Sequence, residues 1–105
     1  MLGRDRRFDD LLRRQLDLFE VDEEPLLDEA DEADSAWANA SREEAEERFG
    51  DYQLVVDAIA ERLLDVRETY AASLDDRTAE KYRMAFNRAA LKRFRPYTAL
   101  LLEGE

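Results

Sequence analysis

The sequence has 105 residues, a formal net charge of −11 and 41% charged residues, with neither cysteine nor histidine. This length allows one domain with a single core, and the missing residue types exclude disulfides, thiolate metal sites and catalysis by a cysteine or histidine side chain. Any metal ion would have to be a hard cation such as Mg²⁺, Mn²⁺ or Ca²⁺ held by oxygen atoms. Abundant leucine and alanine, with little glycine or proline, predict an all-α protein built from a few long helices.

The first predicted helix covers residues 4–20, because apolar residues recur there at helical spacing. These residues are Phe8, Leu11, Leu12, Leu16 and Phe19. Pro25 follows a break in the pattern and favours a position just inside the next helix. A short second helix is predicted over 26–38, where Trp37 is either a buried anchor for the helix or an exposed contact for a partner, since tryptophan is enriched at interface hot spots.

The third predicted helix covers residues 42–73 and gives the strongest periodic signal. Ser41 and Glu44 have the spacing of a capping box at its start. Apolar and aromatic residues then alternate three and four positions apart, which is an a/d heptad seam. The seam consists of Phe49, Tyr52, Val56, Ile59, Leu63, Val66 and Tyr70. Gly50 lies within it, so the helix either continues through the glycine or breaks there, with Asp51 capping a new helix.

A fourth helix is predicted over 77–94, with Asp75 or Asp76 as its N-cap. Pro96 disfavours a helical conformation of the preceding residue, so this helix should end by Arg95. Residues 96–105 form a predicted tail that docks on the core through Tyr97 and Leu100 to Leu102. The short turn after the third helix predicts an antiparallel hairpin, and the whole chain a single domain, 1–105, containing a small bundle of three to four helices.

This arrangement predicts which side chains are buried and which need further cover. The expected buried set is Phe49, Val56, Ile59, Leu63, Val66, Tyr82, Phe86 and Phe94. Because the fourth helix is shorter than the third, Phe49, Tyr52 and Val56 need cover from helix 4–20, from the Trp37 segment or from a second copy of the chain. Together with Trp37, these three residues are the candidate interaction surface. We expect a homodimer that strengthens with salt, because salt screens the repulsion between two acidic chains.

The acidity also has a general explanation. The chain has Lys81 and Lys92 as its only lysines, and all its other basic residues are arginines. Few lysines and many carboxylates are expected of a halophile-like protein kept soluble in high salt. No apolar run reaches the roughly 18 residues of a membrane span, and no signal peptide is visible, so we expect a soluble cytoplasmic protein.

One stretch resembles a family of enzymes. The residues "ERFGDYQLVVDAIA", 47–60, are similar to the E-x-L-G-D-x-L-x-x helix of the MazG-like all-α nucleotide pyrophosphatases, and "DEADE", 28–32, stands roughly where their first acidic motif falls. The resemblance implies an Mg²⁺-dependent nucleotide hydrolase. Carried over, its metal ligands are Glu29, Glu32, Glu47 and Asp51. The sequence departs from the pattern at Asp28, where the family has glutamate, and at Arg48, where a ligand belongs.

The segment from Lys81 to Arg95 contains cations and no acid. One flank of the fourth helix carries a basic stripe of Lys81, Arg88, Lys92 and Arg95. The net charge weakens long-range attraction to nucleic acid, so direct binding of DNA or RNA is not expected. The acidic surface fits the opposite role better, in which it imitates a phosphate backbone and blocks a nucleic-acid-binding protein.

The sequence therefore favours a non-catalytic acidic helical protein, without a cofactor, that acts through helix-face contact with an unknown protein partner or with itself. An Mg²⁺-dependent MazG-like pyrophosphatase and a nucleic-acid mimic are the alternatives. Convergence of the four carried-over carboxylates would discriminate the enzyme from the interaction protein.

Overall fold

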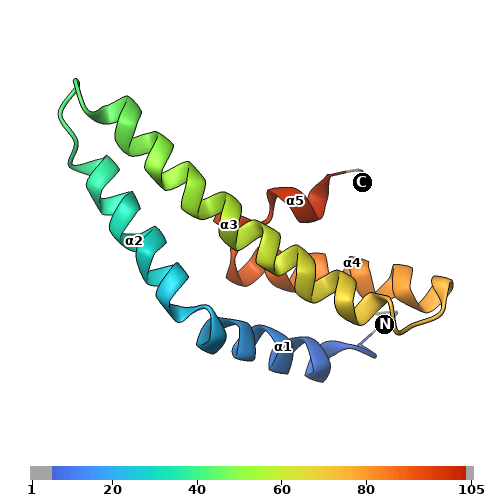
Figure 1. Ribbon diagram of the computed structural model, residues 1–105. Coiled ribbons are helices and arrows are strands. Elements are labelled where there is room, and N and C mark those ends of the chain that lie inside the picture. Colours follow the sequence, from blue (N-terminus) through green and yellow to red (C-terminus); the bar gives the residue numbers. More distant parts are fainter. Residues whose placement is uncertain (1–5, 104–105) are drawn as a thin grey trace, which may run out of the picture.

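The computed structural model describes residues 6–103, which contain five α-helices and one short 3-10 helix (Figure 1). In chain order they are α1 (Asp9–Asp22), α2 (Glu24–Ala38), α3 (Ala45–Ala71), α4 (Asp76–Arg93), the 3-10 helix η1 (Arg95–Tyr97) and α5 (Ala99–Leu102). No strand occurs among the described residues, so the expected all-α class is confirmed. Nor does any helix in this range have the length and apolar character needed to cross a membrane.

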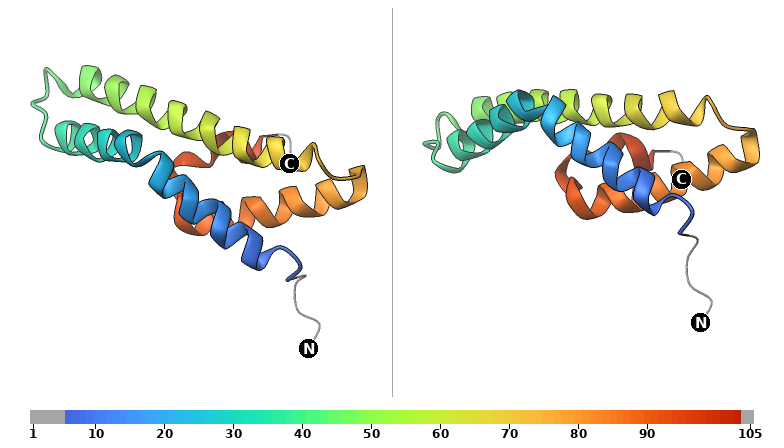
Figure 2. Two further views of the ribbon diagram at one scale, coloured as in Figure 1. Left: turned by 60° about the horizontal axis from the view of Figure 1, so that its bottom comes forward. Right: turned by 90° about the horizontal axis from the view of Figure 1, so that it is seen from below.

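Helix α1 begins later and ends later than predicted. Residues 4 and 5 of the predicted 4–20 helix lie outside the described residues, and residues 6–8 are not helical. The first turn holds Asp9 and Asp10, whose carboxylates suit the positive end of the helix dipole. Pro25 lies in the first turn of α2, as expected. Because proline donates no backbone hydrogen bond, the chain bends between α1 and α2 instead of continuing as one helix (Figure 2).

Helix α3 is continuous through Gly50, so the alternative of a break there is wrong. The capping box is present: the Glu44 amide donates to Ser41 Oγ at 3.3 Å, and the Ser41 amide lies 3.5 Å from Glu44 Oε1. Residues 42–44 form a turn, so α3 starts at Ala45 and is shorter at both ends than the predicted 42–73. Its 27 residues rise about 40 Å.

Helix α4 is capped by Asp75, whose carboxylate accepts a 2.8 Å hydrogen bond from the Thr78 amide. This bond, with a second from the Thr78 hydroxyl, lowers the pKa of Asp75. The helix ends at Arg93, before Pro96, as expected. In the tail that follows, Leu101 is buried while Leu102 is exposed, so the predicted docking of Leu102 is wrong.

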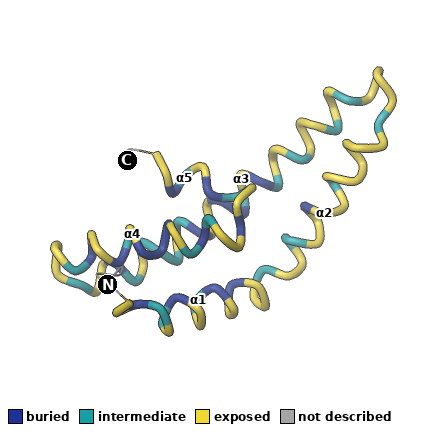
Figure 3. Tube along the Cα trace, turned by 180° about the vertical axis from the view of Figure 1, so that it is seen from behind, coloured by how far each residue is buried: buried dark blue, intermediate teal, exposed yellow. Residues whose placement is uncertain are grey.

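The buried side chains gather at one end of the molecule, where α1, α3 and α4 pack together (Figure 3). Tyr82 lies at the centre of this three-helix end. Its ring packs against Phe8, Tyr70 and Phe86 at centroid distances of 5.5, 4.8 and 5.9 Å. At the other end, α2 and the N-terminal half of α3 (residues 45–58) extend as two paired helices, called here the α2–α3 arm. The radius of gyration is 16.0 Å, whereas a compact domain of this length has about 13 Å.

Candidate protein-interaction site

The α2–α3 arm is closed at its tip by aromatic stacking. The Trp37 ring lies 4.8 Å from that of Phe49 and 5.6 Å from that of Tyr52, with an interplanar angle of 27° to the latter. Trp37 thus anchors α2 on α3 and is still 38% exposed. Its burial is therefore intermediate between the two alternatives, since the ring packs on α3 and is still partly exposed to solvent.

Two predictions of burial along the α3 seam are wrong. Phe49 is 42% exposed and Val66 only half-buried. The physical reason for Phe49 is that α4 does not reach it and α2 alone covers it. Val56 is buried at 9% exposure and Tyr52 is half-buried. Helix α2 therefore covers much of the seam surface that a second copy of the chain would otherwise have to cover. These two residues contribute to the fold of the single chain.

A groove lies along the arm between α2 and α3, and Phe49 does not line it. Its volume is about 450 Å³. The residues that line this arm groove are Glu29, Glu32, Ala33, Ala36, Arg48, Asp51, Leu54 and Val55. Leu54 is 71% exposed there, beside two alanines that leave room for an incoming side chain. Reasoning from the heptad seam missed Leu54, although an off-seam leucine among charged residues is a signal of exposure.

The arm groove brings together three of the four carboxylates that the MazG-like resemblance implies as ligands. Glu29, Glu32 and Asp51 line it, whereas Glu47 does not. Arg48 Nη1 lies 3.7 Å from Asp51 Oδ2, so the guanidinium stands next to a carboxylate that the resemblance implies as a metal ligand. Among residues 6–103, no group of three or more carboxylates is arranged to hold a metal ion.

Comparison with known families, curated proteins and solved structures finds no match. The MazG-like resemblance therefore depends on its motif residues alone.

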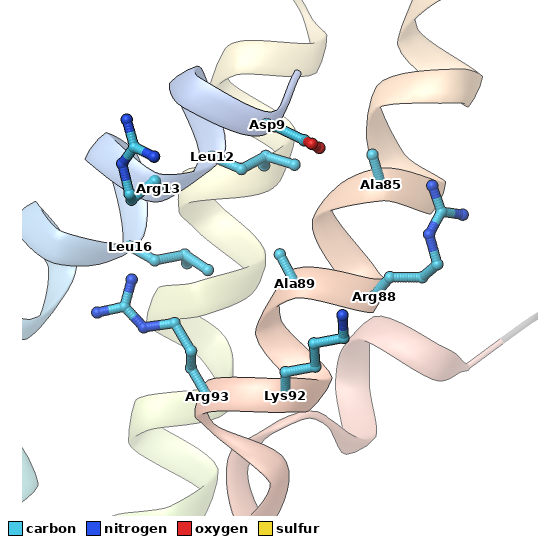
Figure 4. A pocket seen from close by; sticks show the side chains of 9 residues that line it. All are labelled: Asp9, Leu12, Arg13, Leu16, Ala85, Arg88, Ala89, Lys92 and Arg93. Atoms are coloured by element: carbon cyan, nitrogen blue, oxygen red, sulfur yellow. The ribbon is translucent and has the colours of Figure 1, made fainter. Parts of the chain in front are cut away.

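Part of the basic stripe lies at the other end of the molecule, in a groove between α1 and α4 (Figure 4). Arg88 and Lys92 project from α4 there, whereas Arg93 reaches toward α1 and pairs with Asp17 at 2.9 Å and with Glu20. The basic stripe does not line one site. Arg88 and Lys92 line this groove; Lys81 and Arg95 do not. None of these four stripe residues forms an ion pair with another described residue.

One ion pair links α4 to α3. The Arg83 guanidinium donates to both carboxylate oxygens of Glu68 at 2.9 and 3.0 Å. These bonds, with one from Arg67, lower the pKa of Glu68 despite its partial burial.

A buried polar junction was not expected from the sequence. Arg67 Nη1 donates to Asn87 Oδ1 at 2.8 Å and to the Leu101 carbonyl oxygen at 3.1 Å, and Asn87 Nδ2 donates to the same carbonyl at 3.2 Å. This junction ties α5 to both long helices and satisfies groups that would be costly to bury unpaired.

Proposed function

We propose that this protein acts through protein–protein contact, as a homodimer in which the α2–α3 arms of two copies pack against each other through their arm grooves. The observation that carries the proposal is the exposed Leu54 beside Ala33 and Ala36. In a two-fold arrangement the same surface meets itself, so Leu54 of each copy enters the groove of the other. The two arms together make four helices, the number that commonly encloses a core in helical bundles.

The charges of the arm groove support the same arrangement. Arg48 is its one cation, among Glu29, Glu32 and Asp51. Across a two-fold axis, Arg48 of each copy lies opposite carboxylates of the other copy, which favours this register over misaligned ones. The residue that departs from the MazG-like pattern thus has a role in the dimer.

Sedimentation equilibrium tests the proposal. Val56→Glu is unsuitable as a probe because Val56 is buried within the chain. Leu54→Gln removes the apolar anchor without changing charge, and Leu18→Gln, at a 58% exposed leucine on α1, is the matched control. We expect the wild type to dimerise, and to do so more tightly as NaCl rises from about 0.1 to about 1 M. The reason is that the Debye length falls from about 10 to about 3 Å, which screens the repulsion between the two acidic chains. Leu54→Gln should weaken dimerisation about tenfold and Leu18→Gln should not.

A charge reversal tests the register. Arg48→Glu should weaken the dimer, and the double variant Arg48→Glu with Glu32→Arg should restore it. A wild type that is monomeric at every salt concentration, or equal behaviour of the two leucine variants, would contradict the proposal.

The Mg²⁺-dependent hydrolase is the second candidate, because three of its four implied ligands line one groove. Its weakness is Arg48, which lies next to Asp51. Calorimetric titration with Mg²⁺ or Mn²⁺ separates the two functions. A stoichiometric site of micromolar affinity that is lost in Asp51→Asn would favour the enzyme, whereas we expect no such site.

A further inference from the structure

A second groove lies between α1 and α3 at the three-helix end, and its composition differs from that of the arm groove. Its volume is about 530 Å³. The lining residues are Gln15, Leu18, Phe19, Asp22, Glu23, Asp65, Val66, Thr69, Tyr70 and Ser73. They include apolar side chains and three carboxylates but no lysine or arginine. Leu18, which lines this α1–α3 groove, is 58% exposed, so an apolar side chain faces solvent in a chain where 41% of residues are charged.

The shape of the α1–α3 groove suits a helix. On α1 the lining residues recur three and four positions apart, from Gln15 to Asp22, and on the other wall they extend from Asp65 to Tyr70 on α3 and to Ser73 in the turn after it. Residues at such spacing share one face of a helix, so the groove follows both helix axes for about two turns. A helix lying in it would become the fourth member of a bundle with α1, α3 and α4.

The charges that line the groove indicate that its occupant is positively charged. Asp22 stands on the α1 wall and Asp65 on the α3 wall, and neither forms an ion pair with another described residue. Glu23 is half-buried and lies 3.4 Å from Arg62. The net charge of −11 adds a long-range field that attracts cations and raises association rates.

A second copy of the chain does not offer a suitable occupant. Its acid-free basic segment is residues 81–95, but the apolar side of that segment is used in its own core, where Tyr82, Phe86 and Ala90 are fully buried. Among the described residues of α4, Met84 at 55% exposure is the single large apolar side chain left exposed, and one side chain does not form an apolar helix face.

We propose that the α1–α3 groove binds a basic amphipathic helix of a partner protein, with an apolar side chain of that helix against Leu18 and its cations against Asp22 and Asp65. This site is separate from the proposed dimer surface, because Leu54 lies about 18 Å along α3 from Val66.

Fluorescence anisotropy on the full chain tests this inference. The probe is a capped, fluorescein-labelled helical peptide of about four turns, with leucine on one face and lysine on the other, and its counterpart with glutamate in place of each lysine is the charge control. We expect saturable binding of the lysine peptide and none of the glutamate peptide. Leu18→Gln should weaken binding about tenfold, and Leu54→Gln should leave it unchanged.

A second pair of variants separates the local carboxylates from the overall charge. Asp22→Asn with Asp65→Asn should weaken binding several-fold and reduce its dependence on salt. Asp28→Asn with Asp31→Asn makes the same change of charge on α2, outside the groove, and should have a smaller effect. Because the four substituted carboxylates are exposed, unchanged circular dichroism is expected for both double variants.

Three results would overturn the inference: equal binding to wild type and Leu18→Gln, equal effects of the two aspartate pairs, or a loss of dimer in Leu18→Gln, which would assign the groove to a second copy. Failure of the proposed dimer would appear separately, in the sedimentation of Leu54→Gln.

Discussion

The two halves of α3 carry the same heptad seam in different surroundings. In the C-terminal half, Ile59 and Leu63 are fully buried, in one core cluster with residues of α1 and α4. In the N-terminal half, Phe49 has the same seam position but is 42% exposed, because α2 is its main neighbour. A heptad seam shows which face of a helix is apolar; it does not show how many helices cover that face.

The two halves of α3 also differ in what they contribute: the C-terminal half belongs to the stable core, and the N-terminal half to the candidate interaction surface. The three-helix end holds the aromatic cluster around Tyr82, while the arm ends in a groove with an exposed leucine. An exposed apolar side chain that lines a groove with other apolar residues is a candidate for contact with another protein. Four predictions test this contrast.

The largest expected effect is the difference in stability loss when phenylalanine is replaced by alanine at each of the two ends. Phe86→Ala leaves a cavity in a fully buried cluster and should lower the free energy of unfolding by about 3–5 kcal/mol. Phe49→Ala removes a ring that is already partly in water and should cost roughly 1 kcal/mol. Urea unfolding followed by circular dichroism measures both. Equal losses would show that the arm is as well packed as the three-helix end.

The next effect depends on pH and belongs to the three-helix end. Burial raises the pKa of Tyr82 to about 12, more than the hydrogen bond to Gln15 at 2.8 Å lowers it. Between pH 10, the ordinary pKa, and about 12, the unfolded chain has released a proton that the folded chain keeps. The free energy of unfolding should therefore fall as pH rises, by about 1.4 kcal/mol per pH unit.

Urea unfolding across this alkaline range tests the Tyr82 prediction. Tyr82→Phe should reduce the slope, and Tyr97, whose pKa is also raised by burial, should leave a smaller fall of the same sign. An equally steep fall in Tyr82→Phe would assign the effect to other groups.

The polar junction gives a smaller and more local effect. Asn87→Ala leaves the Leu101 carbonyl and Arg67 each with one hydrogen bond fewer and should cost about 1–3 kcal/mol. It should also loosen α5, so limited proteolysis within residues 99–103 should accelerate while cleavage in α2 keeps its rate. Unchanged cleavage of α5 would show that Leu101 packing alone holds it.

The smallest effect has the opposite sign and lies in the arm. A Cβ added at Gly50 meets no atom within 4 Å, and α3 is helical on both sides of it. Gly50→Ala should therefore raise the free energy of unfolding by about 1 kcal/mol, measured by urea unfolding. A loss of stability would contradict the open surroundings of Gly50.

Much of the fold was predictable because it depends on local rules. Periodicity located the helices, Pro25 and Pro96 located two ends, and Asp75 was among the expected caps. The length difference between α3 and α4 indicated that the N-terminal seam needs cover, and the Trp37 segment supplies part of it. These features depend on residues within a few positions of one another.

The candidate surfaces were less predictable because they depend on contacts between distant segments. Leu18 and Leu54 lie off the periodic stripes, and their exposure follows from where α1 and α2 lie on α3. The Arg67–Asn87 hydrogen bond joins residues 20 positions apart, and no spacing rule indicates it. The seam residues Phe49, Tyr52 and Val56 looked like an interface because the sequence did not decide whether an N-terminal segment or a second copy of the chain covers them.

Amide hydrogen exchange along α3, measured over a range of protein concentrations, tests most directly whether the arm is the interacting end. In dilute protein, amides of residues 47–55 should exchange faster than those of residues 59–67, because fewer buried contacts resist local opening. As concentration rises, the arm amides should gain protection through dimer formation, and Leu54→Gln should abolish that gain. Arm amides that are as protected as those around Ile59 and Leu63 at every concentration would contradict the account.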